Sequence, residues 1–437
     1  MQTRRKRVGP AGNLVDRTSY TGWANLNGIG SVATPNPVNA DCIQTQIPVK
    51  CGIGIFLYSE RMADNEEKPP PMDQEVLTDI RGKIDEIDRK LVGLLNDRAE
   101  LVVEVGKLKR QSGIPIYAPH REAAVLKKVT GLNAGPLPAK TIEAVYRELM
   151  SGSFHLEQPL RIGYLGPEGS YCHLASVRHF GSSVKFEDLR AVEGAFTEVV
   201  RSHVDYALVP IENSTGGGIS DSLDAFSQYH DAVNIYAEVQ LEVKRCLLSN
   251  AQPDEIKKIY STSEAFSHCR KWLAVQFSAA TLTTIDTTVN AVKRAIEETQ
   301  SGNRSVAAIG SGLAGEIYGL HVLFQDIEDQ PNNITRFLIL SKQKTLPSGN
   351  DKTSIMFTTQ DRPGALVDVL TVFHRNGINL THIDKRPSGR VNWDYKFFID
   401  AAGHRDETGF AQVIGEARAH CKELTVLGSY PASQRVL

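Results

Sequence analysis

The sequence predicts a multidomain chain in which an all-α domain, an α/β domain and an α+β domain follow one another. An apolar seam with helical spacing runs from Leu77 for about thirty residues. Over residues 159–344, short apolar strand candidates alternate with helical patterns. A polar linker with Pro347 and Gly349 then leads into a strand–helix–strand–strand–helix–strand order. We therefore expect domains at residues 73–158, 159–344 and 352–433, preceded by an extension over residues 1–72.

Composition and charge exclude several classes of protein. The 437 residues carry a net charge of −2 and 41% hydrophobic residues, which favours folded domains and gives no basic character for binding nucleic acid. No run of about 18 apolar residues is present, so we expect no membrane span and a cytoplasmic protein. The six cysteines are scattered, without a CxxC pair or a histidine at zinc-finger spacing. We therefore expect neither a disulfide framework nor a bound metal.

The first 72 residues have no sustained helical or strand period. Basic residues gather at positions 4–7, and the segment ends in a solvated stretch over residues 64–71. We predict a disordered extension without a catalytic role. A basic, acid-poor start is also found in organellar transit peptides, but no amphipathic helix is evident, and Met62 or Met72 are alternative start positions.

The seam that begins at Leu77 continues at steps of three and four residues as a single helix of about thirty residues. A helix of this length needs partner helices, which predicts a homodimer or a higher homo-oligomer. At position 98 the seam supplies Arg98, and Lys109 follows eleven residues later, about 16 Å along nearly the same face. The two cations could hold one small dianion. The alternative is that Arg98 reaches solvent or pairs with a structural carboxylate.

Two further helices are expected, one opening near Pro119 and one over residues 139–157. Together, residues 73–158 resemble the all-helical chorismate mutase family in the stretches IRGKIDEIDRKLVGLLNDRAELVVEVGKLK and PHREAAVL. The resemblance implies that Arg98 and Lys109 bind the carboxylate and ether oxygen of chorismate. It also implies substrate contacts from Arg121, Glu122 and Ser153, and from Arg81 of a partner protomer.

Two positions depart from the commonest pattern of the mutase family. Ala118 stands where many members have an aspartate, so one contact to the substrate hydroxyl is expected to be missing. Glu157 stands where many members have a glutamine that donates a hydrogen bond to the ether oxygen. A carboxylate can only accept hydrogen bonds, so Glu157 has to be protonated for this catalytic role. We hypothesise that the mutase is favoured at acidic pH and declines as Glu157 ionises.

Two polar loops follow strand candidates of the α/β domain, GPEGSY after Leu165 and ENSTGGG after Ile211. Ligands of open α/β sheets collect where strands end, and a Gly-Ser turn that opens a helix presents backbone N–H groups to an anion. Both loops therefore indicate carboxylate binding, although each alone is also typical of a tight turn. Neither GxGxxG nor a Walker lysine occurs, so we expect no nucleotide cofactor.

The triplet TRF at residues 335–337 follows these loops in a fixed order. With GYLGPEGSY and VPIENS upstream, residues 159–344 resemble the prephenate dehydratases. The resemblance implies a two-lobed, periplasmic-binding-protein-like domain with prephenate in the cleft, where Thr335 assists loss of the ring hydroxyl. It implies six further site residues: Ser170, Asn213, Ser214, Thr215, Arg336 and Phe337. The alternative for Thr335 is a strand-edge residue bonded to backbone.

The order of elements in residues 352–433 is that of a ferredoxin-like sandwich. The segment resembles the ACT domain family, because Gly364, Ala365, Leu366 and Val367 match its phenylalanine-binding motif. Its second motif stands as Asp384-Lys385-Arg386-Pro387. The resemblance implies that phenylalanine binds there and inhibits the dehydratase. The alternative is a purely structural dimerisation module.

Taken together, the resemblances imply an enzyme of phenylalanine biosynthesis that converts chorismate to prephenate and prephenate to phenylpyruvate, without a cofactor. Two alternatives stay open. In the first, the helical domain serves only for dimerisation beside an active dehydratase. In the second, the chain is a non-enzymatic amino-acid sensor, which predicts a secretory signal or loss of the TRF frame, and the sequence shows neither.

Overall fold

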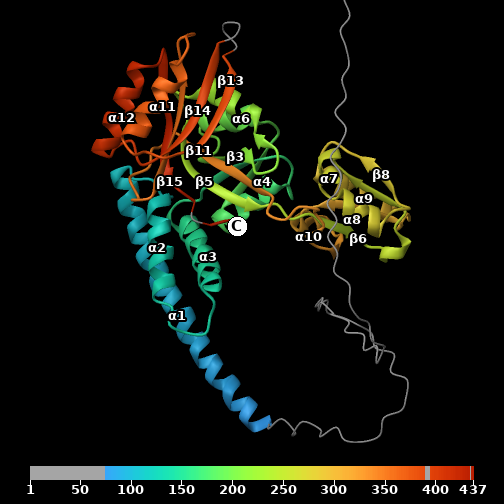
Figure 1. The fold of residues 1–437 in the computed structure, drawn as a ribbon. Helices are drawn as coiled ribbons and strands as arrows, with labels where there is room; N and C mark the ends of the chain where they lie inside the picture. Colours follow the sequence, from blue (N-terminus) through green and yellow to red (C-terminus); the bar gives the residue numbers. More distant parts are fainter. Residues whose placement is uncertain (1–73, 389–393, 434) are drawn as a thin grey trace, which may run out of the picture. The chain divides into compact units, whose positions relative to one another are not determined.

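The computed structural model describes residues 74–388, 394–433 and 435–437 (Figure 1). The extension expected over residues 1–72 lies outside the described residues. No helix in the described part of the chain is long and apolar enough to cross a membrane. The expected order of an all-α, an α/β and an α+β domain is confirmed.

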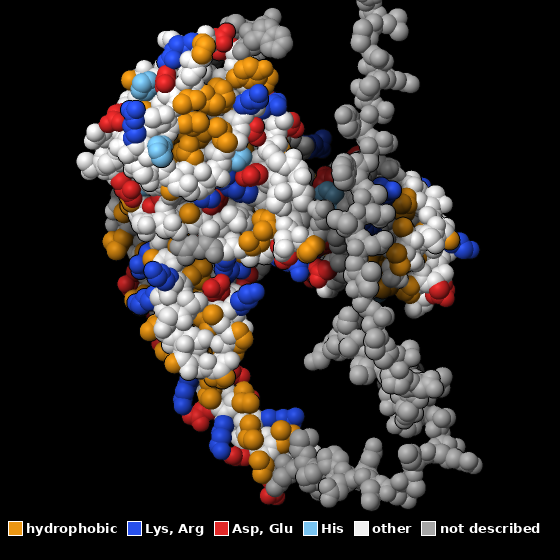
Figure 2. All heavy atoms as spheres, in the orientation of Figure 1, with side chains coloured by type: hydrophobic (Ala, Val, Ile, Leu, Met, Phe, Trp, Pro, Cys, Tyr) orange, Lys and Arg blue, Asp and Glu red, His pale blue; other side chains and the backbone are white. Residues whose placement is uncertain are grey.

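Three helices form the first domain: α1 (Gln74–Ser112), α2 (Pro119–Gly131) and α3 (Ala139–Glu157). At 39 residues, α1 is longer than the apolar seam alone predicts. It ends where Gly113 takes a left-handed conformation (φ 66°) ahead of Pro115. Pro119 then opens α2 at a position where its missing N–H costs nothing. Apolar side chains remain exposed along α1 (Figure 2), for example Leu94 at 65% and Leu101 at 63%.

The α/β domain has two lobes, each built on one sheet. The first sheet has the order β2-β1-β3-β11-β5, with β4 beside β3, and the second has the order β10-β6-β9-β7-β8. The strands of the first lobe are β1 (Arg161–Leu165), β2 (Lys185–Leu189), β3 (Tyr206–Asn213), β4 (Gly217–Gly218), β5 (Asn234–Glu242) and β11 (Ile334–Ser341). Its helices are α4 (Tyr171–Phe180), α5 (Val192–Val200) and α6 (Ser220–Tyr229).

The chain enters the second lobe after β5 and returns to the first in β11. The strands of this lobe are β6 (Cys246–Ser249), β7 (Lys258–Ser261), β8 (Thr281–Thr284), β9 (Val306–Gly310) and β10 (His321–Phe324). Its helices are η1 (Pro253–Glu255), α7 (Ser263–His268), α8 (Arg270–Gln276), α9 (Thr288–Gln300) and α10 (Gly312–Tyr318). Because two crossings join the sheets, the expected two-lobed architecture is confirmed.

The last domain has the expected βαββαβ order. Its elements are β12 (Asp351–Thr358), α11 (Ala365–Arg375), β13 (Leu380–Pro387), β14 (Tyr395–Ala402), α12 (Thr408–Ala419) and β15 (Glu423–Pro431). The sheet has the order β13-β14-β12-β15. Met356, Phe398 and Leu427 from this sheet pack into the same apolar cluster as Phe196 and Phe226 of the first lobe. This shared core fixes the last domain against the first lobe.

Candidate functional sites

A cavity of about 400 Å³ opens among the three N-terminal helices. Arg98 and Lys109 of α1 both line it, together with Ser153 and Glu157 of α3. Arg98 Nη1 donates to Ser153 Oγ at 3.1 Å, and Lys109 Nζ donates to Glu157 Oε2 at 2.8 Å. The two cations on one helical face therefore turn toward the same cavity, and Arg98 is not simply directed into solvent.

The remaining walls of this mutase-like cavity come from α2 and the loop before it. Arg121 and Glu122 line the cavity, and Ala118 also lies on its wall, where it offers no polar group. The apolar lining includes Val102, Val105, Ile116, Val125, Met150 and Phe154. An apolar cavity with a few convergent charges suits a small, doubly charged ring.

Glu157 occupies a tightly packed position between α1 and α3. A Cβ at Gly106 would lie 2.9 Å from Glu157 Cγ, so only glycine lets α1 approach α3 here. Arg110 donates to the backbone carbonyl of Glu157. Together these contacts fix the Glu157 carboxylate beside Lys109.

Arg81 lies on the exposed part of α1, seventeen residues before Arg98 and thus about 25 Å from it along the helix axis. The structure does not bring Arg81 to the cavity of its own chain.

In the α/β domain, Thr335 of β11 pairs in register with Asn213 of β3. Asn213 Nδ2 donates to Thr335 Oγ1 at 2.9 Å and to Asn333 Oδ1 at 2.8 Å. Asn213 Oδ1 accepts from the backbone N–H and the hydroxyl of Thr215 at 2.9 and 2.6 Å. Ser214 bonds the backbone at Asn332 and Ile334. The ENSTGGG loop and the TRF triplet therefore meet at one place, although their sequences are about 120 residues apart.

A cavity of about 690 Å³ opens beside this cluster and is lined by Thr215 and Asn333 together with residues of the second lobe. Its cationic lining includes Arg270, Lys271 and Arg245. Arg245 is only 5% exposed, and within the described part of the chain neither Nε nor Nη1 has a hydrogen-bond partner. A buried guanidinium with unused donors beside a cavity is suited to a carboxylate ligand. Sequence reasoning missed Arg245, because nothing in LEVKRCLLS indicates its burial.

The other members of the predicted site are less closely associated with Thr335. Phe337 packs in the core of the first lobe, and Ser170 caps α4 by accepting from His173 N. Arg336 lies on the opposite face of the sheet from Thr335, because neighbouring strand residues alternate in direction. Its guanidinium is buried between Glu238 and Asp400 and therefore does not face the Thr335 cluster.

The two motifs of the last domain line different places in the single chain. Gly364, in a left-handed conformation, opens α11 beside a pocket of about 250 Å³. Ala365, Leu366 and Val367 also line this pocket, but residues 384–387 do not. Arg386 of β13 instead binds Asp224 of α6, with Nη2 2.6 Å from Oδ2. Asp384 and Pro387 lie on the same strand.

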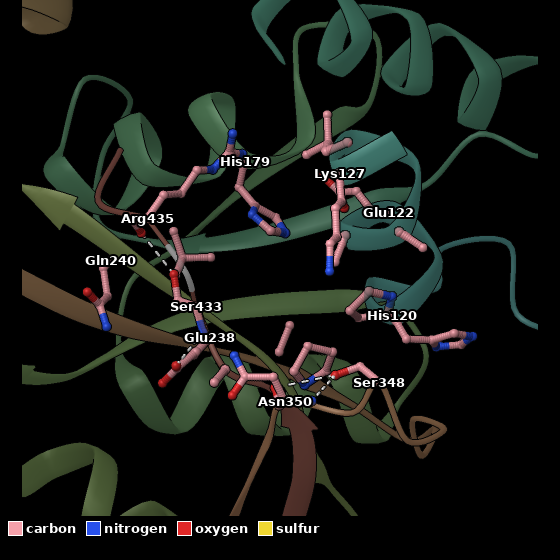
Figure 3. A pocket seen from close by; sticks show the side chains of 18 of the residues that line it. His120, Glu122, Lys127, His179, Glu238, Gln240, Ser348, Asn350, Ser433 and Arg435 are labelled. Carbon is pink, nitrogen blue, oxygen red and sulfur yellow. Dashed lines mark hydrogen bonds between the residues drawn. The ribbon is translucent and has the colours of Figure 1, made fainter. Parts of the chain in front are cut away.

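A further cavity of about 670 Å³ has mixed charge (Figure 3). Glu122 and Lys127 of α2 lie on one side, and Gln240 and Arg435 lie across from them. Burial raises the pKa of Glu122 to about 7. Glu122 lines both this cavity and the mutase-like cavity, so its protonation state affects the electrostatic potential in both cavities. The described residues contain no group of three or more side chains that could hold a metal ion.

Comparison with known proteins assigns all three domains. Residues 80–158 match the family described as chorismate mutase type II, residues 162–345 prephenate dehydratase, and residues 353–417 the ACT domain. A bifunctional chorismate mutase/prephenate dehydratase of Pseudomonas aeruginosa is 40% identical over 366 residues, covering 82% of this chain and 98% of the relative. One from Aquifex aeolicus is 36% identical over 362 residues, again covering 82% and 98%.

Solved structures agree with this assignment. The prephenate dehydratase of Arthrobacter aurescens, solved in complex with L-Phe, is 28% identical and superimposes with a TM-score of 0.57. The match covers 62% of this chain and 90% of that one. With relatives matched over nearly their whole length, this chain belongs to the family of bifunctional chorismate mutase/prephenate dehydratases.

Proposed function

We propose that this chain rearranges chorismate to prephenate in its helical domain and converts prephenate to phenylpyruvate in its α/β domain. These are two consecutive steps of phenylalanine biosynthesis. Two observations carry the proposal: Arg98 and Lys109 converge on one cavity, and Thr335 is bonded to Asn213 beside another. The family membership supports both activities.

The rearrangement needs no nucleophile and no cofactor. The cavity has to hold chorismate in its reactive conformation and to place positive charge where charge develops on the breaking ether bond. Lys109 and Arg98 supply this charge, and Ser153 orients the guanidinium. The apolar walls exclude water, which strengthens these interactions.

The dehydration couples loss of carbon dioxide to loss of the ring hydroxyl, and the ring becomes aromatic. The enzyme mainly has to donate a hydrogen bond or a proton to the leaving hydroxyl. Because Thr335 Oγ1 accepts from Asn213 Nδ2, its own hydrogen is left to donate to the substrate. Arg245 would hold a carboxylate of prephenate from the second lobe.

Phenylalanine regulates the dehydratase through the ACT domain, and the pocket beside Gly364 is its proposed binding place. The separation of that pocket from Arg386 in one chain is consistent with a site completed by a second copy. The exposed apolar seam of α1 further supports a homodimer, with Arg81 reaching the partner's cavity. Light scattering on the parent and on a Leu94→Lys variant tests this: loss of the dimer in the variant is expected.

The domain limits proposed are 73–158, 159–344 and 352–433, which the matched ranges support. A cytoplasmic location is part of the proposal, because the relatives carry out the same biosynthetic steps; cell fractionation tests it.

The proposal is tested by supplying chorismate to the purified chain and following prephenate and phenylpyruvate separately. Both products are expected in succession. An Arg98→Met variant should lose the first step and keep the second when supplied with prephenate, and Thr335→Val should show the reverse. Loss of both activities in either variant would contradict two separate sites.

A further inference from the structure

Strands β3 and β11 are neighbours in one sheet (Figure 1), and they carry two successive pairs of residues whose side chains face opposite sides of it. Thr335 is paired with Asn213, and the next residue along, Arg336, is paired with Glu212. The first pair forms the dehydratase cluster described above. The second pair faces the ACT domain. A single β-ladder therefore connects a reaction site on one face with a domain contact on the other.

Arg336 is bound by carboxylates from both domains. Its Nε lies 2.7 Å from Glu238 Oε2 of β5, and its Nη1 lies 2.6 Å from Asp400 Oδ2 of β14. Nη2 donates to the hydroxyl of Tyr430 of β15 at 2.9 Å. Arg336 is 8% exposed, and Glu238 and Asp400 are each 5% exposed. A buried charge needs all of its partners, so this guanidinium is held firmly only while the ACT sheet stays in place.

A second contact joins the same ladder to the ACT domain. Glu212 Oε2 lies 3.3 Å from His382 Nδ1 of β13, the strand that also carries Asp384 and Arg386. The pairing of β11 with β3 shifts register between Arg336 and Phe337. At such a shift the ladder is locally interrupted and the strand bends. Any displacement of the ACT sheet would thus be felt one residue from Thr335.

We propose that Arg336 is a positioning residue of the dehydratase, which holds Thr335 against Asn213 and transmits the state of the ACT domain to them. Phenylalanine binding would shift the ACT sheet, alter the position of Asp400 at the guanidinium, and move Thr335 out of its productive place. Arg336 touches no substrate. This inference rests on the dehydratase function and the phenylalanine regulation proposed above.

A docking role alone would also place an arginine here, so the test needs a readout that docking does not change. The variant is Asp400→Asn, which keeps the shape of the side chain and removes the charge supplied by the ACT domain. The matched control is Asp224→Asn, which weakens a different ion pair between the same two domains, Arg386–Asp224, without touching Arg336. Mutase activity of each variant reports that the chain is folded.

For Asp400→Asn we expect kcat of the dehydratase to fall about tenfold or more, with KM for prephenate nearly unchanged. The phenylalanine concentration for half-inhibition should change at least about threefold. For Asp224→Asn we expect kcat close to that of the parent chain.

Three results would overturn the inference: an unchanged kcat for Asp400→Asn, an equal fall in the control, or a rise of KM alone. An unchanged response to phenylalanine would remove the coupling. If the parent chain did not dehydrate prephenate, the proposed function would fail instead, so the two failures are distinguishable.

Discussion

Replacing Glu157 with glutamine is expected to raise the mutase activity at neutral pH. Glu157 Oε2 accepts from Lys109 Nζ at 2.8 Å, and only 6% of the Glu157 side chain is exposed. An ionised carboxylate at this place offers no donor to the ether oxygen of chorismate, and it competes with the substrate for Lys109. A glutamine keeps an acceptor for Lys109 and adds an amide donor in the same volume.

The magnitude follows from the contact that the substitution adds. A hydrogen bond to a charged or strongly polarised group contributes about 1.5–3 kcal/mol, or roughly 10- to 150-fold in kcat/KM for chorismate. Some loss of stability is also expected, because the substitution removes the charge that faces Lys109 in a largely buried ion pair, although the amide oxygen still accepts from Lys109.

Chorismate consumption measured at neutral pH tests this reasoning. Both forms are best compared in a Thr335→Val background, where prephenate accumulates and is not drawn into the second reaction. A Glu157→Gln variant with the rate of its parent would refute the role assigned to Glu157.

Two further changes are expected to have separable effects. Arg245→Met should raise KM for prephenate about 10- to 100-fold, because a charged hydrogen bond to the substrate is lost, and should leave the mutase activity unchanged. Steady-state kinetics with prephenate check this, and an unaltered KM would show that Arg245 does not bind prephenate. Glu122→Gln should stabilise the chain above about pH 7 and not below about pH 4.5. The reason is that the folded carboxyl, with its pKa raised to about 7, stays protonated while the unfolded one ionises from about 4.5 upward, so stability is lost as pH rises through that window. Thermal unfolding of the parent and of Glu122→Gln checks this at both ends of the window. The free energies of unfolding of the two forms should differ by on the order of 1–3 kcal/mol at the alkaline end and should agree at the acidic end.

Elements with a strong pattern were predictable from the sequence. The apolar seam of α1 repeats at the period of a helix, and the strands of the ACT domain alternate at the period of a strand. In β13, for example, half-buried and exposed residues alternate. Strand β2 was not predicted, because KFEDL carries charges at an exposed sheet edge and has no apolar run. The position of β11 between β3 and β5 could not be predicted from the local sequence either. It depends on the chain returning after an entire second lobe.

The candidate sites were predictable to the extent that each residue's neighbours are close in sequence or fixed by a helical period. Arg98 and Lys109 share a face because eleven residues make about three turns. Arg245 depends on burial by a distant segment around Glu328, whose Oε2 accepts from its backbone N–H. Arg336 is buried because the ACT domain covers its side of the sheet. Which domain covers which side of a sheet cannot be predicted from a single sequence.

Thr335 and Arg336 are adjacent in β11, but their side chains lie on opposite faces of the sheet. Thr335 bonds Asn213 at the proposed reaction site, and Arg336 contacts the ACT domain, because successive side chains leave a strand on opposite faces. The two neighbours therefore have different surroundings, and on the proposal above Arg336 acts on the reaction only through the strand that it shares with Thr335. No side chain in the described part of the helical domain, residues 74–157, bonds Arg336, so a change in the ACT sheet can act on the dehydratase without passing through the cavity of Arg98 and Lys109. On this arrangement, phenylalanine should inhibit the second reaction more strongly than the first.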